Sequence, residues 1–119
     1  MSFFSFLRSS GAAQRTPDHM TPADFVARHD PDAVVIDVRT DGEYRSGHLA
    51  GAKQIDIGSP DFARRVEALD RDRTYYLYCR SGNRSGHAAR IMRDLGFERV
   101  YNIGGIGELS RAGAEIVRP

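Results

Sequence analysis

The sequence predicts an α/β fold built on a mostly parallel sheet of five strands, with helices packed against it. Short apolar runs bounded by turn residues, such as 33–38 and 74–78, are typical of parallel strands buried on both faces. Between these runs, apolar side chains recur at helix spacing, and this alternation favours parallel pairing through right-handed crossovers. A chain of 119 residues, 40% of them hydrophobic, suffices for one domain with its own core.

We expect a flexible N-terminal segment at 1–16 ahead of a domain that spans 17–119. The segment carries a short apolar cluster between Phe3 and Leu7. This run is too short for the core of a signal peptide, no basic residue precedes it, and it cannot span a bilayer. We therefore favour a frayed terminus over a peripheral membrane anchor or a partner-docking segment.

Helix and strand signals alternate through the first half of the domain. Thr21 is suited to cap a helix, and Pro22 is suited to its first position, where no N–H is needed. The expected elements are strands at 18–20, 33–38 and 53–57, a helix at 22–28 and a helical turn at 41–46.

Two polar residues of this half, Asp37 and His48, could have a structural or a functional role. Asp37 interrupts an apolar strand near its carboxyl end, and a buried carboxylate is costly unless it is paired. We expect it to pair with Arg39 or with loop backbone, and to orient the loop rather than transfer protons. His48 has no His, Cys or carboxylate at metal-ligand spacing, so no metal site is expected there.

The second half of the domain is expected to supply two strands and three helices. The helices place apolar side chains on one face and charged ones on the other. Gly96 is suited to follow the end of the helix that begins near Ser85. The expected elements are helices at 61–69, 85–95 and 106–111, and strands at 74–78 and 100–103.

The only cysteine of the chain, Cys79, lies where a strand meets a small, polar and basic loop. A loop that closes onto a helix N-terminus directs several backbone N–H groups at one spot, where the helix dipole adds positive potential. Gly82 and Asn83 can adopt the turn dihedrals that this requires. Hydrogen bonds and nearby cations favour a thiolate, so we expect the pKa of Cys79 to lie below that of a free thiol.

A thiolate in such a cradle is either a nucleophile towards an anionic substrate or the carrier of a charged sulfur adduct. Between Arg71 and Arg99, seven arginines stand against three acids, which suits a small anionic substrate. Over the whole chain 17 basic residues nearly balance 16 acidic ones, so no nucleic-acid or membrane partner is expected. A single cysteine excludes an intramolecular disulfide and fits a reducing, cytoplasmic location.

The loop at 79–85 resembles the active-site loop of the single-domain rhodaneses, the thiosulfate sulfurtransferase family. Three further segments resemble the family in the same order along the chain: 37–39, 43–52 and 96–105. The family often carries a tryptophan a few residues after its double glycine, whereas this chain has Leu109 there. The resemblance implies a three-layer fold, with helices on both sides of the sheet, and a packing role for His48.

The resemblance also implies sulfur transfer through a persulfide on a catalytic Cys79, with no metal or organic cofactor. The donor would be a small anion such as thiosulfate, and the acceptor would be cyanide or a thiol. Arg80 and Arg84 would orient the donor, loop amides would hold the persulfide, and Asp37 and Arg39 would support the site. The implied anion-binding loop consists of Arg80, Ser81, Gly82, Asn83, Arg84 and Ser85.

Two alternative functions use the same thiolate. Cysteine phosphatases and arsenate reductases have similar loops, but with five residues between cysteine and arginine. Here four residues separate Cys79 from Arg84, and Ser85 occupies the position of the clamping arginine. The other alternative is a persulfide carrier or redox-sensing module that serves a partner protein, and an intact loop fits this role as well as it fits a turnover enzyme.

Overall fold

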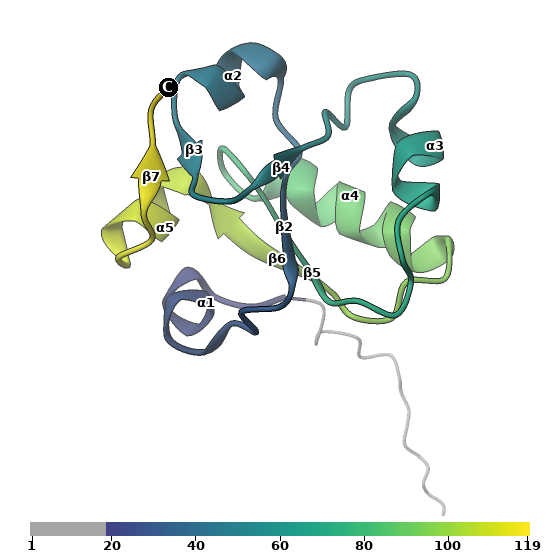
Figure 1. Cartoon of the computed structure of the whole chain (residues 1–119), viewed down its shortest axis with the longest axis horizontal. Coiled ribbons are helices and arrows are strands. Elements are labelled where there is room, and N and C mark those ends of the chain that lie inside the picture. The colour runs from purple at the N-terminus through teal and green to yellow at the C-terminus, as the bar shows by residue number, and fades with distance from the viewer. Residues whose placement is uncertain (1–18) are drawn as a thin grey trace, which may run out of the picture.

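The computed structural model describes residues 19–119, so the flexible segment expected at 1–16 lies outside the described residues. The core is a sheet of four parallel strands in the order β4-β2-β5-β6 (Figure 1). Its strands are β2 (Val34–Asp37), β4 (Lys53–Gln54), β5 (Tyr75–Cys79) and β6 (Val100–Gly105). Helices cover both faces of this sheet, which confirms the three-layer α/β fold.

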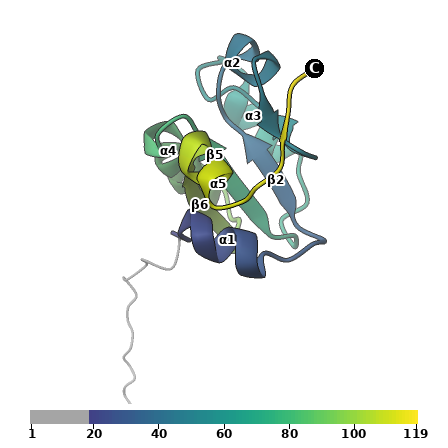
Figure 2. The same ribbon diagram turned by 90° about the vertical axis from the view of Figure 1, so that its left-hand side faces the viewer.

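Two pairs of helices enclose the sheet. The helices α3 (Phe62–Glu67) and α4 (Asn83–Asp94) cover one face, and α1 (Pro22–Arg28) and α5 (Ile106–Arg111) cover the other. The last two pack against each other, and Figure 2 shows them in front of the sheet. A fifth short helix, α2 (Asp41–Arg45), follows the carboxyl end of β2.

The strand β5 is buried along its whole length and divides the core into two halves. Successive side chains of a strand point to opposite faces of the sheet. Leu77 and Cys79 therefore join the half beneath α3 and α4, whereas Tyr76 and Tyr78 join the half beneath α1 and α5. This alternation decides on which side of the sheet each polar residue of the site lies.

Local capping explains where the first two helices begin. Thr21 caps α1 as predicted, since its Oγ1 accepts a hydrogen bond from Asp24 N at 3.1 Å. The helix α2 begins with a capping box that was not predicted, in which Thr40 and Glu43 each bond the backbone N–H of the other. The box holds the Glu43 side chain at the carboxyl edge of the sheet.

Within residues 19–119 the sheet has four strands, one fewer than the five expected. In the described residues, the strand expected at 18–20 is a single parallel bridge between His19 and Asn102. The N–H of Met20 bonds the Asn102 carbonyl at 3.0 Å, and α1 begins two residues later. The early helix start leaves no room for a longer strand after His19.

A small antiparallel sheet was not predicted at all. It pairs β3 (His48–Leu49) with β7 (Ile116–Val117). Each strand has two residues, which is too short for an alternating apolar pattern to be recognised. The pairing brings the last residues of the chain beside the segment that follows α2 (Figure 1).

The helices are short and amphipathic. The longest, α4, has 12 residues, whereas about 20 are needed to span a bilayer. Within 19–119, none of the helices is both long enough and apolar enough to cross a membrane. In α5, Leu109 is fully buried at the position where the family often has tryptophan, so a smaller side chain completes the packing of this helix.

Candidate active site

Cys79 ends β5 and lies beneath the loop that joins this strand to α4. The residue is fully buried, with 0% of its surface exposed. Two backbone N–H groups donate to its Sγ, that of Gly82 at 3.0 Å and that of Ser85 at 3.4 Å. Gly82 has a φ of 97°, a conformation that side chains with a Cβ rarely adopt. The chain therefore turns tightly enough for the loop amides to face the sulfur.

The helix α4 begins at Asn83, two residues before the start expected near Ser85. Asn83 is helical, so of the two residues expected to take turn dihedrals only Gly82 is left-handed. Ser85 consequently lies in the first turn, where backbone N–H groups have no partner within the helix. One of these free donors is the Ser85 N–H that points at Cys79, so the helix dipole and a hydrogen bond act on the same sulfur.

The pKa of the Cys79 thiol reflects two opposing effects. Burial raises this pKa, because it removes water from the thiolate. Hydrogen bonds from the Ser85 hydroxyl and from the N–H groups of Ser85, Ser81 and Gly82 outweigh burial, and the net pKa lies below its ordinary value. These hydrogen bonds favour the thiolate more than the nearby arginine charges do, although both were expected from the sequence to contribute.

Asn102 on β6 holds the loop at Gly82 and at Ser85. Its Nδ2 donates to the Gly82 carbonyl at 3.0 Å, and its Oδ1 accepts from Gly104 N at 3.1 Å. The same Oδ1 lies 2.7 Å from the Ser85 hydroxyl, which is also 3.4 Å from Cys79 Sγ. The hydroxyl has one proton, so Asn102 and the thiolate compete for it.

The double glycine at the end of β6, Gly104 and Gly105, lets the loop approach the sheet. A Cβ on Gly105 would lie 2.4 Å from the Arg80 carbonyl oxygen, a distance that only glycine avoids. A Cβ on Gly82 would lie 3.5 Å from Gly104 Cα, so the two backbones are in contact. The loop is thus packed directly against the start of α5.

The two arginines of the loop are in different environments. Arg84 forms a bidentate ion pair with Glu43 of α2, with its Nη1 and Nη2 at 2.8 and 2.9 Å from the two carboxylate oxygens. The Arg84 guanidinium holds the pKa of Glu43 down to about 2. Arg80 is exposed and has no acidic partner among residues 19–119. Arg80 is therefore the loop arginine whose charge remains available to an anion.

Asp37 and Arg39 form a buried pair, as expected from the sequence. Arg39 Nε and Nη2 lie 2.9 and 2.7 Å from the Asp37 carboxylate, and Nη2 also donates to the Gly47 carbonyl at 2.7 Å. Burial lowers the pKa of Arg39, but the hydrogen bonds and charge of Asp37 outweigh it and raise the pKa. Tyr78 donates to Asp37 at 2.6 Å, and both burial and this carboxylate raise the pKa of Tyr78.

Asp37 and Arg39 lie on the other side of β5 from the Cys79 thiol. The Asp37 network joins Tyr78, and Tyr78 points to the face of β5 opposite to Cys79. The cause is that successive side chains of a strand point to opposite faces of the sheet, so Tyr78 and Cys79 lie on different sides. Asp37 and Arg39 organise the neighbouring side of the carboxyl edge, and no hydrogen bond links them to the loop.

His48 has the packing role that the resemblance implied. Its ring stacks on Tyr44 with 3.7 Å between ring centroids, and its Nδ1 lies 2.9 Å from the Tyr44 carbonyl oxygen. Within the part of the chain that the structure describes, no group of three or more His, Cys, Asp or Glu side chains could hold a metal ion.

Three residues of the site were not recognised from the sequence: Glu43, Asn102 and Tyr78. Glu43 follows Thr40 at the spacing of a capping box, a signal that indicates a helix start but not a partner 41 residues away. Of the three, Asn102 is the easiest to recognise from the sequence, because asparagine is uncommon within a strand. Tyr78 lies in an apolar run and carries no signal for its bond to Asp37.

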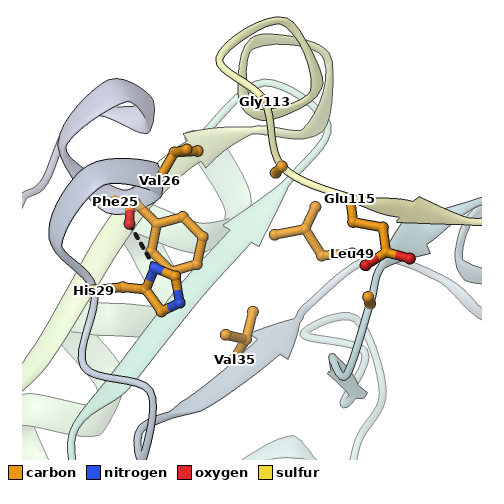
Figure 3. Close-up of a pocket in the computed structure, with 9 residues that line it drawn as sticks. Phe25, Val26, His29, Val35, Leu49, Gly113 and Glu115 are labelled. Carbon is orange, nitrogen blue, oxygen red and sulfur yellow. Dashed lines mark hydrogen bonds between the residues drawn. The ribbon is translucent and has the colours of Figure 1, made fainter.

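A separate apolar cavity of about 340 Å³ opens on the α1 side of the sheet (Figure 3). Phe25 and His29 of α1 line it together with Leu49 of β3. His29 Nδ1 lies 2.7 Å from the Phe25 carbonyl oxygen, so this ring nitrogen is engaged within its own helix. Cys79 is not among the residues that line this cavity.

Comparison with protein families shows that residues 21–112 match the rhodanese-like domain. The uncharacterized protein YqhL of Bacillus subtilis is 35% identical over 92 residues, covering 77% of this chain and 71% of that protein. A protein of Cytophaga hutchinsonii named tRNA uridine(34) hydroxylase is 33% identical over 105 residues. That match covers 85% of this chain but 34% of the relative, so this chain spans about a third of its length.

Solved structures resemble this fold closely. A rhodanese-related protein from Thermoplasma volcanium is 29% identical with a TM-score of 0.73, covering 83% of this chain and 96% of that one. An E. coli rhodanese with anions is 28% identical with a TM-score of 0.62, covering 73% of this chain and 99% of the other. A rhodanese-like domain from Anabaena, 23% identical with a TM-score of 0.74, covers 86% of this chain and 80% of its own, and shares the fold.

Proposed function

This chain belongs to the rhodanese-like domain family, and we propose that it is a sulfurtransferase that works through a persulfide on Cys79. The observation that carries the proposal is the pair of N–H groups, from Gly82 and Ser85, that donate to Cys79 Sγ. Donors placed where charge resides stabilise the thiolate before attack and the terminal sulfur of the persulfide after it.

The proposed reaction has two displacements. The Cys79 thiolate attacks the outer sulfur of thiosulfate, a sulfur–sulfur bond to Cys79 forms, the bond within thiosulfate breaks, and sulfite leaves with the electron pair. An acceptor thiolate or cyanide then attacks the outer persulfide sulfur, and Cys79 leaves as a thiolate. Charge is conserved in both steps, and no metal, organic cofactor or oxidant takes part.

Loop residues have distinct roles in this proposal. The exposed Arg80 attracts the donor, while Arg84 acts through Glu43 and keeps the loop attached to α2. Cys79 is fully buried, so the donor approaches its sulfur from the side of the loop that residues 80–85 form. Ser81 and Asn83 are exposed on this loop and line the approach. Asp37 and Arg39 support the same edge of the sheet from its other face.

The test is the intact mass of the protein after incubation with thiosulfate. We expect a gain of one sulfur atom that a thiol reductant removes, and no gain in Cys79→Ser. Sulfite release in step with sulfur loading identifies transfer. An aryl phosphate tested in parallel examines the phosphatase alternative, and robust phosphate release without persulfide would overturn the proposal. Single loading without turnover by cyanide or small thiols would favour a persulfide carrier for a partner.

A second candidate activity comes from the relatives. Proteins named tRNA uridine(34) hydroxylase, including one from Salmonella agona that is 37% identical over 109 residues, match most of this chain. This chain covers 31% of that relative, so the whole protein's activity is an inference here. Mass spectrometry of tRNA nucleosides after incubation with the protein tests it, and unchanged uridines would leave sulfur transfer as the function.

The domain boundaries belong to the same proposal. We take 17–119 as the sulfurtransferase domain and 1–16 as a flexible segment ahead of it. Deleting 1–16 should leave the melting temperature and the sulfur-loading rate unchanged. A fall in melting temperature would show that the segment belongs to the folded domain. A cytoplasmic location fits a reaction that needs a free thiolate.

A further inference from the structure

A second cavity, of about 380 Å³, lies at the carboxyl edge of the sheet on the side opposite to Cys79. It is bounded by the end of α2 and the start of β3 on one side, and by α5 and the residues of β7 on the other. Three arginines line it, Arg39, Arg111 and Arg118, and no acidic side chain does. Its volume is that of a site for a small molecule.

Arg39 is buried and incompletely bonded. Its side chain is 5% exposed, and its Nε and Nη2 are engaged by Asp37 and the Gly47 carbonyl. Its Nη1 makes no hydrogen bond with any residue between 19 and 119. A buried donor without a partner is costly, and an oxygen atom of a ligand in the cavity would satisfy it.

Arg111 and Arg118 add charge at the mouth of the cavity. Both are exposed, and neither forms an ion pair with an acid of the described chain. Arg111 Nη1 lies 3.6 Å from where a Cβ of Gly107 would be, and Arg118 Cγ lies 3.4 Å from the same position at Gly47. Arg111 therefore packs against Gly107 on one wall of the cavity, and Arg118 packs against Gly47 on the opposite wall. Guanidinium groups without acidic neighbours suit carboxylate and phosphate oxygens.

The cavity shares a wall with the Cys79 loop. Gly105 is in contact with the Arg80 carbonyl on one side, and the next two residues, Ile106 and Gly107, line the cavity on the other. Both sites open at the carboxyl ends of the parallel strands, where ligands bind in sheets of this kind. A molecule held by the three arginines would lie beside the loop that carries the sulfur.

We propose that this cavity binds the carboxylate or phosphate group of the small molecule that accepts sulfur from Cys79. The role as an acceptor site rests on the proposed sulfur transfer. The binding of an oxyanion in the cavity does not depend on it. The three guanidiniums hold the oxyanion. The rest of the acceptor extends across the start of α5, so that its thiol meets the persulfide.

Direct binding tests the cavity without any chemistry. The Cys79→Ser protein is titrated with succinate in one arm and inorganic phosphate in the other, and backbone amide shifts are followed by NMR. We expect shifts at Gly47 and Gly107, and the arm with the tighter binding identifies the oxyanion. Shifts confined to Gly82 and Ser85 of the Cys79 loop, or none at all, would overturn the proposal.

Charge removal separates the cavity from general basicity. In Arg111→Gln combined with Arg118→Gln, we expect binding of the preferred probe to weaken about tenfold, as when a charged contact is lost. Arg90→Gln is the matched control, because Arg90 is exposed on α4 at the opposite face. Equal weakening by the control and the double variant would mean a non-specific charge effect and would contradict the proposal.

Acceptor selectivity tests the link to sulfur transfer. After loading with thiosulfate, the protein is discharged by mercaptosuccinate or by neutral 2-mercaptoethanol, and the ratio of the two kcat/KM values is compared. We expect the double variant to lower this ratio about tenfold relative to Arg90→Gln. An unchanged ratio overturns the acceptor role. A protein that never loads sulfur instead refutes the proposed function, while the NMR titration still decides whether the cavity binds an oxyanion.

Discussion

Two positively charged sites lie back to back at the carboxyl edge of this sheet, and they are built in different ways. The Cys79 loop obtains its positive potential from backbone N–H groups of one short segment, those of Gly82 and Ser85. The arginine cavity obtains it from guanidiniums at Arg39, Arg111 and Arg118, which come from three separate segments. The comparison shows that a loop can carry its own anion site, whereas a site made of side chains exists only once distant segments have packed together.

The two sites also differ in what holds them in place. The loop is held by Asn102 and by contact with the double glycine, and most of its donors survive any change of side chain. The cavity depends on one buried pair, since Asp37 orients Arg39. Substitutions in the loop should therefore change sulfur transfer more than stability. Substitutions beside the cavity should change the free energy of unfolding more than sulfur transfer. Four changes test this difference, in order of decreasing effect.

Cys79→Ser should have the largest effect on the loop and little on the cavity. The hydroxyl is nearly the same size as the thiol but is a poor nucleophile, so sulfur loading and transfer should be lost completely. The free energy of unfolding should change by less than about 1 kcal/mol, because no cavity is created. Sulfur loading by intact mass and urea denaturation measure the two quantities. Residual loading on the variant would place the persulfide on another group.

Asp37→Ala should have the largest effect on stability. It leaves Arg39 buried without its carboxylate, which costs about 3–5 kcal/mol in the free energy of unfolding. Asp41→Ala is the matched control, because Asp41 pairs with Arg45 on the surface, where an ion pair is worth about 1 kcal/mol or less. Urea denaturation of both variants gives the difference. Equal losses in the two variants would mean that the buried pair contributes no more than an exposed one.

Asn102→Ala should affect the loop at an intermediate level. It removes hydrogen bonds to Gly82, Gly104 and Ser85, and we expect the free energy of unfolding to fall by about 1–3 kcal/mol. The loop amides should be held less firmly on Cys79, so the pKa of its thiol should rise. The pH dependence of alkylation by a neutral reagent measures this pKa.

Asn83→Ala is the control for this change, because Asn83 is an exposed side chain at the first position of α4. We expect its alkylation profile to match that of the unaltered protein. If Asn102→Ala loses stability while its alkylation midpoint stays where it was, then Asn102 supports the sheet and not the thiolate.

The pair between Glu43 and Arg84 should have the smallest effect, and it should appear only in acid. The pKa of Glu43 is lowered to about 2 in the folded protein from its ordinary value of 4.5. A lowered pKa stabilises the fold above the unfolded value, and this contribution is lost as the pH falls from about 4.5 towards 2. Because Arg84 is partly exposed, we expect less than about 1 kcal/mol.

Glu43→Gln should remove this contribution. The difference in the free energy of unfolding between the two proteins should be constant above about pH 5 and should shrink in the acid range. Urea denaturation at a series of pH values measures it. A difference that stays the same down to pH 2 would show that the pair does not contribute through the charge of Glu43.

The order of helices and strands could be predicted because their signals are local. Thr21 and Pro22 mark the start of α1, and the apolar runs mark the parallel strands, so the parallel α/β architecture followed from the residues, while the three layers were implied by the family resemblance. The fifth strand, expected at 18–20, is reduced within the described residues to one bridge at His19, because α1 begins soon after it. The pairing of β3 with β7 was missed, because it joins two-residue strands that lie far apart in the chain.

The sequence by itself determined the Cys79 cradle, because every group that forms it lies within the seven residues of 79–85. A left-handed glycine and a helix N-terminus direct these N–H groups to one point through short-range geometry alone. Only the tertiary structure decided that Arg84 is occupied by Glu43, that Asn102 holds the loop, and that Arg39 faces away from the thiol. Those outcomes depend on which face of the sheet a side chain takes and on which distant segment packs there, and neither is set by residues close in sequence.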